Sequence, residues 1–141
     1  MKQLELKYLA PYLPYDLRLY WHSESDPVWH EMDMFNIHNV IQYTRDYPED
    51  KRWKPILRPL SDLTKEIEIN GEKFVPFEKL GGTLNGNDGE SMYITHLFNC
   101  SLGKVEPKFL PYWVVVNFFE WHFDFFGLIP EGLAVDINTI E

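Results

Sequence analysis

Apolar and polar residues alternate over several short stretches of the chain, and alternation with a period of two is typical of a half-buried strand. Residues 16–22 follow this pattern through Leu17, Leu19 and Trp21 and predict a first strand. Residues 133–138 repeat the pattern and predict a final strand.

Two prolines and one possible helix start shape the rest of the N-terminal part. Pro11 and Pro14 require any helix before Ala10 to end there, and we expect an extended segment to follow. An Asp26 cap before Pro27 indicates a short helix that places Val28, Met32 and Phe35 on one face. Residues 32–43 also alternate like a strand, so a strand near residues 36–44 competes with that helix.

The clearest local signal is Asn70-Gly71 between two strand-like stretches. Both residues of a type I′ turn have positive φ, and Asn-Gly meets that requirement best. The sequence therefore predicts a tight β-hairpin over residues 66–76. Pro76 cannot donate to a strand ladder, so the second strand should end near it or lie at an edge.

The C-terminal third contains the strongest helical pattern. At about 100° per residue, Asn117, Glu120 and Asp124 fall on one narrow polar stripe, while apolar residues cover the remaining surface. We expect one long, aromatic-rich helix over residues 112–126, which ends at Gly127 and supplies most of the core.

Two further segments predict loops. Residues 45–58 contain two prolines and a local charge of +2, which predicts a turn followed by an extended, solvated connection. Residues 81–89 read GGTLNGNDG and predict a surface loop, either structural or functional. This run matches neither a phosphate loop nor the ligand spacing of a calcium loop.

Together these elements predict an α+β fold in a single domain spanning residues 1–141. A small antiparallel sheet with a β-hairpin is packed by the one long C-terminal helix. The chain has 141 residues, of which 45% are hydrophobic and 25% charged. This composition is typical of one folded domain and excludes intrinsic disorder.

Charge and cysteine content narrow the partners and the compartment. The formal net charge of −9 disfavours binding to phosphate backbones and anionic bilayers, so we expect neither a nucleic acid nor a membrane partner. Acidic residues interrupt the apolar segment 109–129, which argues against a membrane span. Cys100 is the one cysteine, and residues 1–9 lack a signal-peptide pattern. We therefore expect a cytoplasmic protein.

Histidines and acidic residues are the candidate metal ligands of the chain. The first three of the five histidines are spaced by eight residues, which on a helix separates ligands by about 12 Å, although His22, His30 and Glu31 remain free to meet through folding. The five are His22, His30, His38, His96 and His122.

His122 is the most unusual histidine, because the predicted helix places it on the apolar face. A core histidine bonded to a carbonyl or carboxylate fits it better than a catalytic base, since Glu120 and Asp124 point to another face. Cys100 has no neighbouring motif that lowers a thiol pKa and suits a small buried apolar role. The sequence therefore assigns no catalytic, cofactor-binding or metal-binding residue.

Three blocks of sequence are distinctive as strings: residues 9–15 (LAPYLPY), residues 54–64 (KPILRPLSDLT) and residues 125–138 (FFGLIPEGLAVDIN). The second block runs on into the Asn70-Gly71 hairpin, and the match extends over about half of the chain. The three blocks resemble a group of short uncharacterised proteins encoded in phages and prophages of Bacteroides-like bacteria. The resemblance implies an intracellular accessory protein of a mobile element in the cytoplasm of the bacterial host, and it carries over no functional residue.

Three functional hypotheses follow. The first is a non-enzymatic accessory or protein-interaction module with a protein partner, since no catalytic set is present and Tyr and Trp are favoured interface anchors. Four tryptophans are candidates for exposure: Trp21, Trp29, Trp53 and Trp113. The second is an acidic decoy that occupies a nucleic-acid-binding protein of the host. The third is a small metal-binding enzyme that uses His22, His30 or His122 with neighbouring acids.

Overall fold

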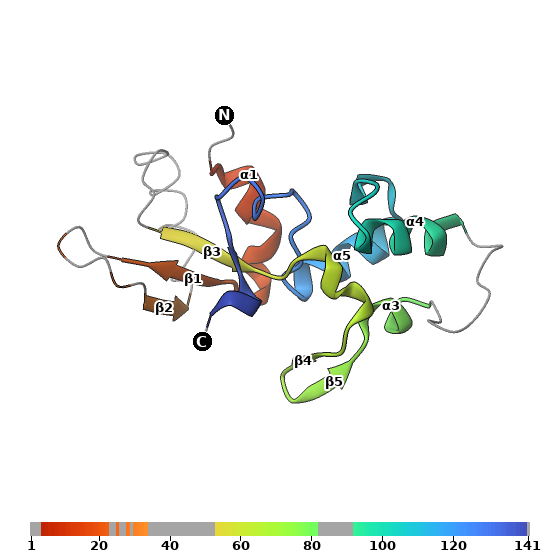
Figure 1. The fold of residues 1–141 in the computed structure, drawn as a ribbon, viewed down its shortest axis with the longest axis horizontal. Coiled ribbons are helices and arrows are strands. Elements are labelled where there is room, and N and C mark those ends of the chain that lie inside the picture. Colours follow the sequence, from red (N-terminus) through yellow and green to blue (C-terminus); the bar gives the residue numbers. More distant parts are fainter. Residues whose placement is uncertain are drawn as a thin grey trace. The chain divides into compact units, whose positions relative to one another are not determined.

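The structure of the chain is a computed structural model, which describes residues 4–22, 25, 28, 30–33, 53–81 and 92–140 (Figure 1). The chain falls into two compact units. Unit 1 combines Met1–Arg58 with Phe126–Glu141, and unit 2 is Pro59–Phe125. Within these described ranges, helices accompany two small sheets, which confirms the α+β class. The expectation of one domain over residues 1–141 stays a prediction.

Unit 1 begins with one continuous helical segment, whereas the sequence predicted a helix followed by an extended stretch. Helix α1 (Leu6–Leu9) ends where predicted, but a 3-10 helix, η1 (Ala10–Tyr15), continues directly from it. Pro11 stands in the first turn of η1, where a missing N–H group and a fixed φ are tolerated. Asp16 then adopts a left-handed backbone with φ of 55°, which turns the chain into the first strand.

The sheet of unit 1 has the strand order β2-β1-β3-β6. Strand β1 (Arg18–Trp21) confirms the first predicted strand and pairs antiparallel with β2 (His30–Asp33) and β3 (Trp53–Leu57). Strand β6 (Val135–Asp136) pairs with β3 in parallel, so the sheet is mixed and the expectation of a purely antiparallel sheet is corrected. The parallel pair is reached by a long crossover connection, which such pairs require.

Two predictions in this unit are wrong in detail. Met32 lies in β2 and not on a short helix, because pairing with Leu19 of β1 fixes the segment as a strand. Residues 53–57 are extended as expected, yet they form β3, an inner strand of the sheet, and not a solvated connection. The strand expected near residues 36–44 and the basic residues 45–52 lie outside the described residues.

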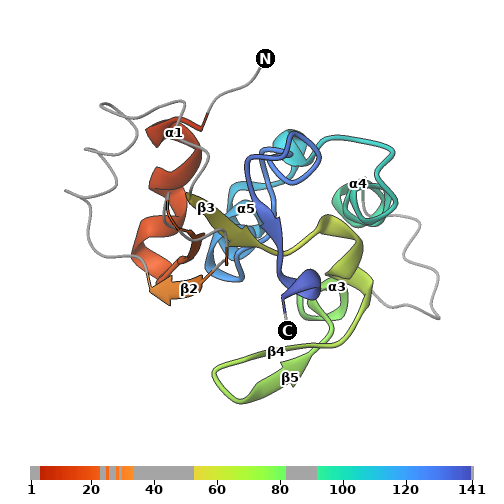
Figure 2. The ribbon, with the colours of Figure 1, turned by 60° about the vertical axis from the view of Figure 1, so that its left-hand side comes forward.

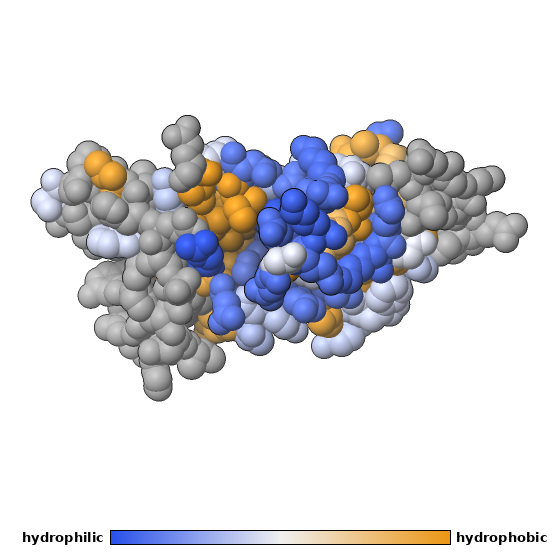
Figure 3. Space-filling model, turned by 90° about the horizontal axis from the view of Figure 1, so that it is seen from below, coloured by the Kyte–Doolittle hydropathy of each residue, from blue (hydrophilic) through white to orange (hydrophobic). Residues whose placement is uncertain are grey.

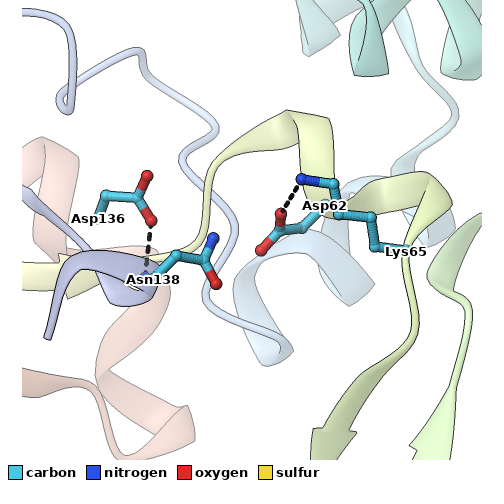
Figure 4. Close-up of polar contacts among 4 residues, drawn as sticks. All are labelled: Asp62, Lys65, Asp136 and Asn138. Carbon is cyan, nitrogen blue, oxygen red and sulfur yellow. Dashed lines mark hydrogen bonds and ion pairs between the residues drawn. The ribbon is translucent and has the colours of Figure 1, made fainter. Parts of the chain in front are cut away.

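The core of unit 1 is formed by apolar side chains from α1, η1, the sheet and the C-terminal segment. The rings of Tyr8 and Phe126 also meet edge to face, with their centroids 5.2 Å apart. After β6, a 3-10 turn, η4 (Ile137–Thr139), is capped by Asp136, whose carboxylate accepts a hydrogen bond from the Asn138 N–H group at 2.8 Å (Figure 4). The buried apolar residues are Leu4, Leu9, Tyr12, Leu17, Leu19, Trp53, Ile56, Leu57, Leu128 and Ala134.

Unit 2 opens with a 3-10 helix, η2 (Leu60–Thr64), and the predicted hairpin. Strands β4 (Ile67–Ile69) and β5 (Glu72–Phe74) pair antiparallel around Asn70 and Gly71. Their φ values of 52° and 83° have the sign that a type I′ turn requires, so the prediction is confirmed. The hairpin projects away from the helices of its unit in both ribbon views (Figures 1 and 2).

Among the described residues of unit 2, three helices follow the hairpin: α3 (Pro76–Lys79), α4 (Met92–Ser101) and α5 (Tyr112–Glu120), with a 3-10 turn, η3 (Pro107–Phe109), before α5. Pro76 ends the second hairpin strand, as expected, by starting α3. Helix α4 was not predicted. The segment 82–91, which includes most of the glycine-rich loop, lies outside the described residues.

The predicted long helix is shorter than expected, because α5 ends at Glu120 and not near Gly127. Beyond it His122 adopts φ of 61°, and the N–H groups of His122 and Phe123 bond to the carbonyls of Phe119 and Phe118 at 3.1 and 2.8 Å. The rings of Phe118 and Phe123 pack with centroids 5.6 Å apart. These bonds and this contact form a Schellman motif, in which a residue in the left-handed conformation, here His122, ends the helix.

The core of unit 2 forms around α5, α4 and the segment from η2 to α3. Both Val114 and Phe118 of α5 are fully buried. The core contains Leu63, Ile67, Phe77, Leu80, Ile94, Leu97, Cys100, Leu110, Val114, Phe118, Trp121 and Phe123.

Candidate functional site: an exposed aromatic surface

Helix α4 divides its side chains between the core and the surface of unit 2. Ile94, Leu97 and Cys100 recur at helical spacing and are buried. Tyr93 and His96 lie at the edge of this buried face and are half-buried. Because they are three residues apart, their side chains are neighbours on the same side of the helix.

Rings from α4, η3 and the start of α5 form what we call the aromatic surface: Tyr93, His96, Phe109, Tyr112 and Trp113. The exposed fractions of the last three are 76%, 84% and 51%. In their own segment, Leu110 and Val114 are buried and hold the chain against the core. On the face drawn in Figure 3, hydrophobic residues likewise reach the surface at several places between hydrophilic ones.

Ring contacts join the three segments of the aromatic surface. Tyr93 and Trp113 meet edge to face with centroids 5.5 Å apart. His96 and Phe109 meet edge to face at 6.2 Å. Both distances lie in the range of favourable aromatic pairs, each worth about 0.5–1.5 kcal/mol beyond burial. The surface is therefore contiguous across α4, η3 and α5.

Hydrogen bonds from the two α4 residues fix the neighbouring loops. The Tyr93 hydroxyl donates to the Leu80 carbonyl at 3.3 Å, which connects α4 to the end of α3. His96 Nε2 lies 2.8 Å from the Glu106 carbonyl oxygen, and a ring N–H at this atom donates to it. The histidine thereby holds the loop between α4 and η3.

One ion pair lies at the edge of the aromatic surface. Lys108 Nζ is 3.1 Å from a carboxylate oxygen of Glu106 and 5.2 Å from the centroid of the Phe109 ring. Both charged side chains are exposed, so the pair contributes little to stability. It places exposed charged groups beside Phe109, as at the rim of an interface.

Of the four tryptophans that the sequence offered as exposed anchors, only Trp113 lies in the aromatic surface. Trp53 is buried in β3, Trp21 is half-buried in β1 and Trp29 lies outside the described residues. Sequence reasoning missed Phe109 and Tyr112. Their neighbouring prolines, Pro107 and Pro111, were the available signal, since each stands at the start of a new short helix.

The structure also places the histidines. His22 is half-buried after β1, His30 lies in β2, and His38 is outside the described residues. His96 belongs to the aromatic surface. His122 lies beyond the end of α5, so the prediction that it projects from the middle of a helix face is wrong. Within the ranges that the structure describes, no three His, Cys, Asp or Glu residues are placed to hold a metal ion.

The carboxylates near His122 do not share the predicted stripe. Glu120 is exposed at the end of α5, whereas Asp124 lies beyond the helix and is 4% exposed. Asp62 in η2 is a second buried carboxylate of unit 2, and its Oδ1 atom lies 3.5 Å from Lys65 Nζ (Figure 4). This ion pair offsets part of the cost of burying the Asp62 charge.

Cys100 occupies the buried face of α4, as its predicted apolar role requires. Burial disfavours the thiolate and raises the pKa of the thiol to about 11. At neutral pH the thiol is protonated, so it lacks the reactive form that a catalytic cysteine uses.

Comparison with known proteins found no matching family model, no matching curated protein and no matching solved structure. The resemblance to phage and prophage proteins stays a prediction. No helix among the described residues is both long and apolar enough to cross a membrane.

Proposed function

We propose that the protein is a non-enzymatic accessory or interaction module that binds a protein partner through its aromatic surface. One observation carries the proposal: Phe109, Tyr112 and Trp113 are at least half exposed, and the rings of Phe109 and Trp113 contact two neighbouring residues of α4, His96 and Tyr93. Contiguous exposed apolar surface is uncommon on proteins without a partner, and Tyr and Trp are enriched among residues that dominate binding energy.

The surrounding structure supports this proposal. Leu110 and Val114 anchor the segment in the core, so its aromatic rings stand on a fixed backbone. Presenting rings in a preformed arrangement lowers the entropy lost on binding. The resemblance to phage and prophage proteins gives the proposed context, which is an accessory protein in the cytoplasm of a bacterial host.

The test compares capture of host proteins by the wild-type chain and by Phe109→Ala/Trp113→Ala, from nuclease-treated lysate at low and high salt. Phe98→Ala is the matched control, because Phe98 is also an exposed aromatic residue of α4 but packs on Phe77, outside the aromatic surface. We expect one dominant partner that persists at high salt, is retained by the control and is lost from the double variant.

Two results would reject the proposal. Equal capture by the wild type and the double variant would exclude the aromatic surface as the binding site. Capture of a basic protein that disappears at high salt would favour the acidic decoy instead, because exposed charge pairs are screened by salt.

A further inference from the structure

We infer that Gly81 is a positioning residue for the aromatic surface. The space beside Gly81 admits the Tyr93 hydroxyl, and the Tyr93 ring held in this position orients Trp113. The inference rests on the proposed function for its biological meaning. The structural part of the inference concerns Gly81, Tyr93 and Trp113 of unit 2. This part can be tested on the chain alone, without a binding partner.

The first step is steric. A Cβ atom built on Gly81 would lie 2.7 Å from the Tyr93 hydroxyl oxygen, closer than side-chain carbons approach such atoms. The other nearest atoms, Ile94 Cδ1 and Tyr93 Cζ, lie at 3.7 and 3.9 Å, which are ordinary contacts. Any larger residue at position 81 therefore displaces the hydroxyl end of Tyr93, while its other neighbours tolerate the added carbon.

The second step is conformational. Gly81 follows the last turn of α3 and donates its N–H group to the Glu78 carbonyl at 3.0 Å, with φ of 110°. Glycine adopts such a φ at low cost. This backbone leaves the Leu80 carbonyl as the acceptor of the Tyr93 hydroxyl at 3.3 Å. The backbone at residues 80 and 81 thus supplies both the acceptor and the free space.

The third step connects Tyr93 to Trp113. Tyr93 is half-buried, and its ring meets Trp113 at a centroid distance of 5.5 Å. Trp113 is half exposed, and the Tyr93 ring is a contact that it makes with α4. A displaced Tyr93 ring therefore changes the position of Trp113, although Gly81 itself touches no partner.

The experiment records the indole N–H signals of the full chain by ¹H–¹⁵N correlation NMR. The chain has five tryptophans, and Trp113→Phe identifies the Trp113 cross-peak. Gly81→Ala is compared with Tyr93→Phe and with the double variant. Gly71→Ala is the matched control, because Gly71 also has a positive φ of 83° but no atom within 4 Å of an added Cβ.

We expect Gly81→Ala to displace the Trp113 cross-peak and Gly71→Ala to leave it in place. In the double variant the hydroxyl that meets the new Cβ is absent, so the cross-peak should return to its position in Tyr93→Phe. An unmoved cross-peak in folded Gly81→Ala would overturn the inference. The same holds for a displacement that persists in the double variant, because strain in the backbone would then explain it.

A second variant keeps the inference testable where Gly81→Ala fails to fold. Tyr93→Leu removes the ring without touching Gly81, and we expect it to displace the Trp113 cross-peak. An unmoved cross-peak there would show that Tyr93 does not orient Trp113. If the cross-peak is displaced but Trp113→Ala captures the partner as well as the wild type does, the proposed function is rejected and the inference about Gly81 and Tyr93 stands.

Discussion

Burial sets the chemistry of the Cys100 thiol. Its pKa lies near 11, above the ordinary value of 9.0, because the core disfavours the thiolate. The folded state consequently holds this proton to a higher pH than the unfolded state does. Between pH 9 and pH 11 the folded chain binds more protons at this group, so the contribution to the free energy of unfolding falls as pH rises.

We expect the slope of stability against pH to be less negative in Cys100→Ala than in the wild type across this window. Urea unfolding at several pH values measures it, and comparing slopes cancels the titration of Lys and Tyr residues common to both chains. In parallel, a thiol reagent at pH 8 should react slowly with the native wild type and rapidly in urea. Fast labelling of the native chain would contradict the assigned burial.

The conformation of His122 leads to a second prediction at the residue scale. A left-handed backbone costs a residue with a Cβ about 1–2 kcal/mol relative to glycine. We therefore expect His122→Gly to be more stable than His122→Ala by about 1 kcal/mol, as measured by chemical denaturation. Both variants lose the imidazole, so their difference isolates the backbone. Equal stability of the two would argue against the Schellman motif.

Individual residues also show where sequence reasoning succeeds. Asn70-Gly71 was identifiable because a two-residue turn has few solutions and these side chains fit one of them. Trp113 was identifiable as a candidate anchor by residue type alone. Phe109 was not, since its exposure depends on Pro107 and Leu110 being buried beside it.

At the scale of elements, α5 shows how a continuous apolar pattern hides a helix end. Residues 112–126 read as one helix because Asn117, Glu120 and Asp124 fall on one stripe and apolar or aromatic residues fill most of the other positions. The chain instead stops the helix at Glu120 and turns Phe123 back onto Phe118. A ring contact between these two residues offsets the cost of the left-handed residue between them, and periodicity contains no sign of that contact.

Helix α5 provides a prediction about packing. Phe118 is fully buried among the core residues of unit 2, so Phe118→Ala should lower the free energy of unfolding by about 3–5 kcal/mol. Tyr112→Ala, on the same helix but 84% exposed, should change it by less than about 0.5 kcal/mol. Urea unfolding followed by circular dichroism measures both. Similar losses in the two variants would contradict the assigned faces of the helix.

At the scale of the whole molecule, the order of the units along the chain matters most. In the sequence, unit 2 is inserted between the two segments of unit 1. Strand β3 precedes unit 2 and β6 follows it, and these two strands pair with each other. The β3–β6 pair therefore closes a loop that contains all of unit 2. When unit 2 is folded, most of the loop is already ordered, so closing it costs little entropy. When unit 2 unfolds, the entropic cost of closing the loop rises and the β3–β6 pair becomes less stable.

This topology predicts coupling between the units. Destabilising unit 2 with Phe118→Ala should also speed amide hydrogen exchange at Val135 and Asp136, which pair with β3, relative to Tyr112→Ala. Native-state exchange monitored by NMR measures this. Exchange of the β6 amides that ignores Phe118→Ala would show that the units unfold independently, and would count against one cooperative domain.

The sequence by itself determined the α+β class, the first strand and the hairpin, because alternation and turn chemistry act between residues close in the chain. It did not determine the parallel β3–β6 pair or the end of α5. The aromatic surface was also beyond it, because this surface depends on contacts between separate segments: Tyr93 with Trp113 and His96 with Phe109. Only tertiary structure decides which of many aromatic residues the core leaves in water.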